Sequence, residues 1–239
     1  MFVVNIIIKR QKMLEILQYD FIQNALIAGV LISIAAGIIG SLVVVNKITF
    51  LTGGIAHSSY GGIGLAIYMG IPVLFGATVF AVLTAILIAI ITLKNRTRID
   101  AIIGMMWASG MAIGIIFVDL TPGYNVDLMS YLFGSIIAVS REDLIYMSVL
   151  DVFIISIVVF FYKQILAVSY DSEFASLRGI NVKFFYTLIL ILAALCVVAA
   201  IKAVGLILVI ALLTIPTYLA ESFSSKLSTM MIISSILAT

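Results

Sequence analysis

Long apolar stretches separated by short polar connections dominate the chain from residue 24 onward. A helix needs roughly 20 mostly apolar residues to cross a bilayer, and several stretches meet that requirement. A last apolar stretch, from Leu227 to Thr239, is only 13 residues long and is too short for a helical crossing. The pattern predicts an all-α, polytopic membrane helix bundle with seven full spans and an eighth that is a half-span or is truncated. The seven spans are residues 25–45, 54–71, 73–93, 101–118, 144–162, 184–201 and 203–220.

The composition also indicates a multi-pass membrane protein. Hydrophobic residues make up 64% of the 239 residues, charged residues make up 10%, and the mean hydropathy is +1.32. A soluble domain carries about 25% charged residues. The single cysteine, Cys196, excludes a disulfide framework and a cysteine metal cluster. The net charge of +2 gives no reason to expect a nucleic-acid partner.

The Lys and Arg residues between the predicted spans fall mostly on one side. If the connection 94–100 is cytoplasmic, alternating spans place eight of them inside and only Arg141 and Lys202 outside, apart from the N-terminal tail. Because cytoplasmic connections carry an excess of Lys and Arg, we expect this orientation. The N-terminus then lies outside, together with the three basic residues of the tail. Their position conflicts with the excess of Lys and Arg expected on the cytoplasmic side. The eight inner residues are Lys47, Lys94, Arg96, Arg98, Lys163, Arg178, Lys183 and Lys226.

The N-terminal segment and one outer connection differ from the spans. In residues 1–23 an apolar run precedes the basic residues, which is the reverse of a signal peptide. We interpret this segment as interfacial and amphipathic, and residues 24–239 as one transmembrane domain. The outer connection, 119–143, is acidic, which is typical of a solvated loop, although such acids can also concentrate cations. Its acids are Asp119, Asp127, Glu142 and Asp143.

The stretch from Phe50 to Pro72 carries the only histidine of the chain, His57. On a helix, Gly54, His57, Gly61 and Gly64 share one face. Glycines on a membrane helix let a neighbouring backbone approach closely, so we expect this helix to be central in the bundle. A buried imidazole needs a hydrogen-bond partner or a wet path. Two interpretations stay open: a histidine bonded to another helix, or a gate or ligand position on a transport pathway.

The connection 163–185 contains the pattern of a short amphipathic helix. Asp171 and Glu173 stand near its start, where negative charge favours a helix, and Gly179 stands at its end. Its apolar side needs something to pack against, either a partner protein or the membrane surface. The apolar residues of this helix, three positions apart, are Phe174, Leu177 and Ile180.

Motifs for soluble catalysis are missing from the sequence. No G-x-x-x-x-G-K-S/T loop for ATP occurs, because the chain contains no Gly-Lys pair, and H-E-x-x-H is impossible with one histidine. An acidic residue that stands out within a predicted span is Asp151, where a carboxylate costs about 2.5–3.5 kcal/mol, so it should face the bundle or be protonated. An intramembrane enzyme using His57 and Asp151, or a purely structural protein, are alternatives without a supporting motif.

Four stretches together resemble the permease family of ABC importers for divalent metals, and the resemblance runs from about residue 22 to the end. Residues 122–144 read PGYNVDLMSYLFGSIIAVSREDL, and residues 169–180 read SYDSEFASLRGI. Residues 202–216 read KAVGLILVIALLTIP. Residues 50–66 read FLTGGIAHSSYGGIGLA, which places His57 on the histidine of the family.

The resemblance implies a permease domain over residues 24–239 that dimerises around a central pathway in a prokaryotic plasma membrane. It implies import of zinc, manganese or iron, with ATP hydrolysed on a separate ATP-binding subunit and metal delivered by an extracytoplasmic metal-binding protein. The chain itself would be no enzyme and would need no cofactor. The alternative within transport is a permease for a metal chelate of the siderophore or cobalamin type.

The resemblance also assigns site residues. The family often has an aspartate four residues before its histidine, where this chain has Gly53. Since a lone imidazole is a poor cage for a divalent cation, His57 either gates the pathway or binds metal, alone or with Asp151. Segment 169–180 matches the coupling helix that docks on the ATPase subunit. The expected docking residues are Asp171, Glu173, Phe174, Leu177, Arg178 and Gly179.

Overall fold

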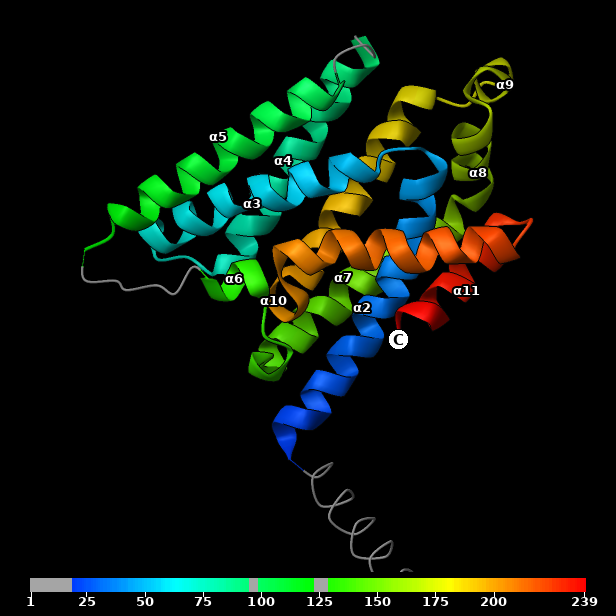
Figure 1. The fold of residues 1–239 in the computed structure, drawn as a ribbon. Coiled ribbons are helices and arrows are strands. Elements are labelled where there is room, and N and C mark those ends of the chain that lie inside the picture. Colours follow the sequence, from blue (N-terminus) through cyan, green and yellow to red (C-terminus); the bar gives the residue numbers. More distant parts are fainter. Residues whose placement is uncertain (1–18, 95–98, 123–128) are drawn as a thin grey trace, which may run out of the picture.

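The computed structural model describes residues 19–94, 99–122 and 129–239, and within these ranges every regular element is helical, as predicted (Figure 1). The elements are α2 (Asp20–Val45), α3 (Thr49–Met69), α4 (Val73–Lys94), α5 (Ile99–Asp119), α6 (Met129–Phe133), the 3₁₀ turn η2 (Ile136–Ala138), α7 (Arg141–Phe160), α8 (Tyr162–Tyr170), α9 (Ser172–Leu177), α10 (Val182–Phe223) and α11 (Leu227–Ala238).

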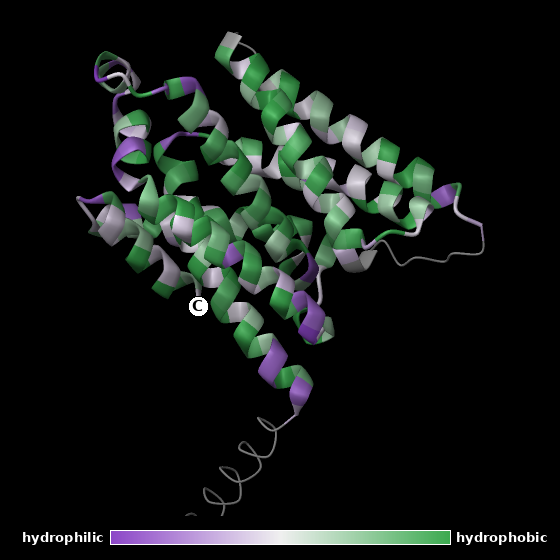
Figure 2. Ribbon diagram, turned by 180° about the vertical axis from the view of Figure 1, so that it is seen from behind, coloured by the Kyte–Doolittle hydropathy of each residue, from purple (hydrophilic) through white to green (hydrophobic). Residues whose placement is uncertain are grey.

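Five of the described helices are long and apolar enough to cross a membrane: α2, α4, α5, α7 and α10. Figure 2 shows apolar residues along the helices and hydrophilic residues gathered near helix ends and connections. Because such surfaces suit lipid rather than water, the multi-pass membrane architecture expected from the composition is confirmed. The helix α9, the end of α4 and the start of α5 lie at one end of the bundle, opposite α6 and the start of α2 (Figure 1).

The predicted N-terminal segment is only partly covered. Residues 1–18 lie outside the described residues, and α2 begins at Asp20, so the last residues of the predicted segment 1–23 are already helical. The carboxylate of Asp20 pairs with the guanidinium of Arg141 at 3.3 Å, and both side chains are 75% exposed. An exposed pair of this kind contributes little to stability.

The glycines of α3 bring its backbone against two neighbouring helices, as predicted. A Cβ atom on Gly64 would lie 2.2 Å from the carbonyl oxygen of Gly114 on α5. On the other side of α3, a Cβ on Gly62 would lie 2.3 Å from the carbonyl oxygen of Gly76 on α4. Every residue from Leu51 to Gly64 is buried. The helix α3 is therefore central to its half of the bundle, between α4 and α5.

The residues predicted as two spans, 184–201 and 203–220, form α10, whose two halves run in different directions (Figure 1). The break lies at Gly205, with φ 82° and ψ 163°, a backbone conformation that favours glycine. The loop after α6 crosses the break so closely that a Cβ on Gly205 would lie 2.3 Å from the carbonyl carbon of Phe133. The N–H of Ser135 donates to the carbonyl of Lys202 at 3.1 Å, which satisfies a backbone group at the break.

The prediction that Asp143 belongs to a solvated acidic loop is wrong. Its side chain is 8% exposed, and its carboxylate accepts a hydrogen bond from the ammonium of Lys202 at 2.5 Å. The same carboxylate accepts from the N–H of Ser140, whose hydroxyl in turn caps α7. A buried charge needs such partners. Asp119 and Glu142 are exposed, as expected, and Asp127 lies outside the described residues.

The connection predicted over residues 163–185 is largely helical. The span expected at 144–162 is α7, which ends at Phe160, and α8 follows after a break at Phe161. Burial explains the extra helix, because Ile165 and Val168 lie three apart on one face and are buried against the bundle. Only a short segment beyond α8 is left to project from this end.

The close contact of α3 with α5 predicts the effect of added bulk. In Gly114→Ala the new methyl group would lie 2.5 Å from the carbonyl oxygen of Tyr60, so we expect a loss of about 1–3 kcal/mol in stability. Gly104→Ala, on the same helix, is the matched control, because its methyl group meets no atom within 4 Å. Thermal unfolding of the detergent-solubilised chain measures both variants, and equal midpoints would contradict the tight contact.

Candidate functional site

His57 lies on the side of α3 that faces α5, and its imidazole stacks on the indole of Trp107. The ring centroids are 3.9 Å apart and the planes differ by 10°. His57 is 9% exposed, and these two residues are the only histidine and the only tryptophan of the chain. The register that directs Gly54 and Gly61 to α5 also directs His57 there, which follows the predicted helical face.

The imidazole is buried without a hydrogen bond at one nitrogen. Among the described residues, Nδ1 of His57 has no partner. A buried polar atom left unpaired costs about 1–3 kcal/mol. The prediction of a histidine hydrogen-bonded to another helix is therefore not met at Nδ1, and the contact with the neighbouring helix is a ring stack instead.

Apolar groups fill the space one turn before His57. A Cβ on Gly53 would lie 2.9 Å from Cδ1 of Ile210 on α10 and 3.9 Å from the Trp107 ring. The ring of Phe50 lies 6.3 Å from that of Trp107. In the described part of the chain, no group of three His, Cys, Asp or Glu residues gathers in one place. From these residues, an ion at His57 meets one imidazole among aromatic and aliphatic side chains.

Asp151 lies on α7 and faces protein, since only 3% of it is exposed. Both of its carboxylate oxygens lack a hydrogen-bond partner among the described residues, so no hydrogen bond joins it to His57. The helix α7 packs against α2 and α10, whereas α3 packs mainly against α5, α4 and α10. The role of Asp151 as a metal ligand stays a prediction.

The short helix expected after residue 170 is α9, and local interactions define both of its ends. The carboxylate of Asp171 accepts from the N–H of Phe174 at 2.9 Å, and Glu173 lies in the first turn. Gly179, with φ 76°, follows the helix, and the N–H of Ile180 donates to the carbonyl of Ala175 at 3.0 Å. Ala175 is fully buried, so one side of α9 is anchored to the bundle.

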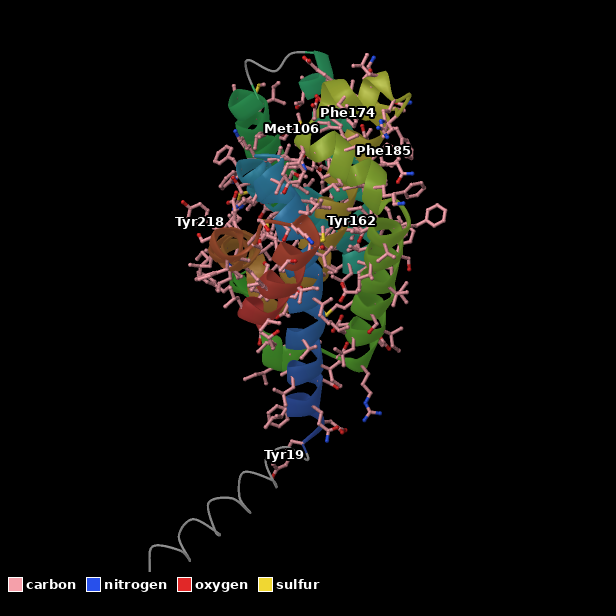
Figure 3. All side chains as sticks on the ribbon, turned by 90° about the vertical axis from the view of Figure 1, so that its right-hand side faces the viewer. Tyr19, Met106, Tyr162, Phe174, Phe185 and Tyr218 are labelled. Atoms are coloured by element: carbon pink, nitrogen blue, oxygen red, sulfur yellow. The ribbon has the colours of Figure 1, made fainter. Side chains whose placement is uncertain are left out.

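The other side of α9 presents apolar side chains at the surface. Phe174 is 47% exposed and Leu177 is 88% exposed. The guanidinium of Arg178 lies 4.8 Å from the centroid of the Phe174 ring. Figure 3 shows Phe174 at the end of the bundle opposite Tyr19. The docking residues expected from the sequence therefore gather on one exposed segment.

Trp107 is the site residue that the sequence interpretation missed. A signal for it exists, because Trp107, Gly110 and Gly114 follow one another at i, i+3 and i+7 on α5. The glycines mark the face of α5 that contacts another helix, and the tryptophan shares that face. Which residue of α3 it would meet depends on how the two helices align, which only the structure shows.

Known proteins resemble this chain over most of its length. The profile of the ABC 3 transport family matches residues 18–239. A probable metal transport system membrane protein of Chlamydia trachomatis is 40% identical over 211 residues, covering 86% of this chain and 72% of that protein. The manganese transport system membrane protein MntC of Listeria monocytogenes is 33% identical over 220 residues, covering 92% and 78%.

A solved structure has the same fold. PsaBC from Streptococcus pneumoniae, in complex with Fab, superposes with a TM-score of 0.85 and 30% sequence identity, covering 95% of this chain and 82% of that chain. The family profile and the relatives each cover most of the sequence, and the range matched by the profile includes α3 and α9. This chain therefore belongs to the ABC 3 transport family.

Proposed function

We propose that this chain is the membrane permease subunit of an ATP-driven importer of divalent transition-metal ions in a bacterial cell membrane. The observation that carries the proposal is the family match over residues 18–239, together with relatives named for metal and manganese transport. ATP is bound and hydrolysed by a separate subunit, and an extracytoplasmic metal-binding protein delivers the ion. The permease acts as a homodimer in the lipid bilayer.

The proposed crossings of the membrane are α2, α3, α4, α5, α7 and the two halves of α10, with α11 as a shorter apolar segment. The length of α3 supports its inclusion, since 21 residues span about 31 Å. The excess of Lys and Arg in the sequence around α9 and between α4 and α5 supports a cytoplasmic position for the end of the bundle where α9 lies. The end with α6 then faces the binding protein.

His57 is the proposed contact of the permease with the ion. It stands on the helix most enclosed by its neighbours, and its Nδ1 lacks a partner. One imidazole binds a divalent cation weakly, which suits an importer that captures its ion on another protein and must release it again. Zinc, manganese and iron(II) share much of their preference for nitrogen and oxygen ligands, so the binding protein selects among them.

The helix α9 is the proposed coupling helix. Its buried Ala175 anchors it, and only Arg178 to Asn181 separate it from α10, whose first turn is capped by the Asn181 side chain. When the ATPase subunit moves α9, this short connection transmits the movement to α10. The first half of α10 leads to the break at Gly205, beside which Lys202 holds Asp143 at the start of α7. Such rigid connections suit a switch between outward and inward access.

The other hypotheses lack a specific supporting feature. A chelate permease, an intramembrane enzyme and a purely structural protein were left open by the residues alone. The relatives reported above are named for metal and manganese transport, not for chelates. The pair on which an intramembrane enzyme would depend, His57 and Asp151, shares no hydrogen bond in the described residues.

The proposal predicts metal uptake that depends on His57. Permease, ATPase subunit and binding protein are reconstituted in liposomes, and ATP-dependent uptake of manganese, zinc and iron(II) is measured ion by ion. We expect uptake of at least one ion, and a decrease of about tenfold or more in His57→Ala, which removes the imidazole. The variant should still retain the ATPase subunit. Uptake of none of the three ions by the wild type would overturn the proposed function. Full uptake by His57→Ala would show that His57 serves only the packing of the helices.

A second prediction concerns Asp151 as a further contact of the ion. Asp151→Asn removes the negative charge with little change of shape, so we expect reduced uptake in the same assay while assembly is retained. Asp20→Asn is the matched control, because that carboxylate is 75% exposed and distant from the bundle interior. Equal uptake in both variants would leave Asp151 a structural residue.

The third prediction tests α9 as the docking segment. Phe174→Asp puts a charge into the expected contact, where its desolvation without a partner costs several kcal/mol. We expect a permease that folds and inserts, but the amount of ATPase subunit that co-purifies with it should fall about tenfold or more. Each 1.4 kcal/mol of lost binding free energy lowers the affinity by a factor of ten. Phe174→Leu, which keeps an apolar side chain, should retain the subunit. Equal recovery with Phe174→Asp and wild type would exclude this segment as the docking site.

A further inference from the structure

The indole of Trp107 stacks on a face of the imidazole of His57 and not on its ring edge. The planes are 10° from parallel and the centroids are 3.9 Å apart, so the indole covers one face of the imidazole. A metal ion binds imidazole through a nitrogen lone pair, which lies in the plane of the ring. Stacking on the ring face therefore still permits coordination of an ion by a ring nitrogen. It also fixes the ring plane, within which the ion must lie.

The hydrogen bond that usually orients a metal-binding histidine is missing at one nitrogen here. Such a histidine commonly donates its second N–H to a carboxylate, a carbonyl or water, which sets the orientation of the ring. Within the described residues, Nδ1 of His57 is buried and has no partner. The ring contact with Trp107 is the interaction that holds the imidazole plane.

Trp107 is itself held in place from both sides. On α5, Gly110 packs so closely on α3 that a Cβ would lie 2.4 Å from Cα of Ser58, the residue next to His57. This contact fixes the position of the indole along the helix axis relative to the imidazole. On the other side, the bare backbone of Gly53 lets Ile210 pack close beside the indole, since a Cβ on Gly53 would lie 3.9 Å from the indole ring and 2.9 Å from Ile210.

We propose that Trp107 is the positioning residue of His57: its indole, in place of a hydrogen bond at Nδ1, sets the plane in which the imidazole binds a divalent cation. This inference rests on the proposed function. A cation bound at the ring edge withdraws electron density from the imidazole and strengthens its attraction to the electron-rich indole. Because Trp107 is the only tryptophan of the chain, its fluorescence reports on an ion at this site.

The test combines fluorescence with uptake. Mn²⁺, a paramagnetic quencher, is added to the full chain purified in detergent, and we expect saturable quenching of Trp107 in the wild type and no saturable quenching in His57→Ala. In the reconstituted complex with saturating Mn²⁺-loaded binding protein, we expect Trp107→Leu to lower the rate of Mn²⁺ uptake about tenfold. Trp107→Phe keeps an aromatic face and should restore most of this rate.

The matched control is Phe117→Leu. Phe117 is an aromatic residue of the same helix whose ring lies 5.3 Å from Tyr68 of α3, away from His57, and its variant should behave as the wild type. An unchanged uptake rate in Trp107→Leu, with uptake lost in His57→Ala, would overturn the positioning role and leave the proposed function intact. Absence of metal uptake by the wild type would overturn the function itself. Should Trp107→Leu fail to assemble, quenching that persists in His57→Ala would by itself overturn the inference.

Discussion

The rest of the structure depends on the backbone contact between α3 and α5. Gly64 of α3 and Gly114 of α5 leave no space for a side-chain carbon at their crossing, because a Cβ on Gly64 would lie 2.2 Å from the carbonyl of Gly114. In lipid, close packing of this kind replaces the hydrophobic effect as the force between helices. The same contact sets the alignment of the two helices, and so it places the indole of Trp107 on the imidazole of His57.

A second close crossing joins the loop after α6 to α10. Gly134 and Gly205, both with positive φ, let the loop after α6 pass the break of α10. Beside the crossing, the half-buried ammonium group of Lys202 and the buried carboxylate of Asp143 neutralise each other. Removing one partner of such a pair leaves an uncompensated charge, so the break of α10 and the start of α7 are held together. The chain can thus change direction inside the bundle without an unpaired charge.

The chemistry of the site is sparse, and this sparseness is consistent with transport. An ion at the proposed position beside His57 would meet one imidazole with an indole stacked on it, and no group of three His, Cys, Asp or Glu gathers among the described residues. Such a site suits a brief contact with the ion better than tight binding. By contrast, α9 exposes Phe174 and Leu177 at one end of the bundle, where apolar area is costly unless something covers it. The permease proposed here would therefore bind its protein partner through a larger surface than it offers to its ion.

The sequence by itself determined what local rules decide. Apolar runs predicted the helices, the spacing of Gly54, His57 and Gly61 predicted a close-packed face, and Asp171 with Gly179 predicted the ends of α9. Each of these depends on residues within a few helical turns, through periodicity, capping or the freedom of glycine at positive φ.

The tertiary structure alone decided the contacts between distant residues. Lys202 meets Asp143 across 59 positions of the sequence, and this pair turned a predicted loop acid into a buried one. Trp107 meets His57 because two glycine faces align α5 with α3, and Gly205 breaks α10 where another loop crosses it. No local pattern encodes such partners, because their separation in space is set by the packing of whole helices rather than by the spacing of neighbours along the chain.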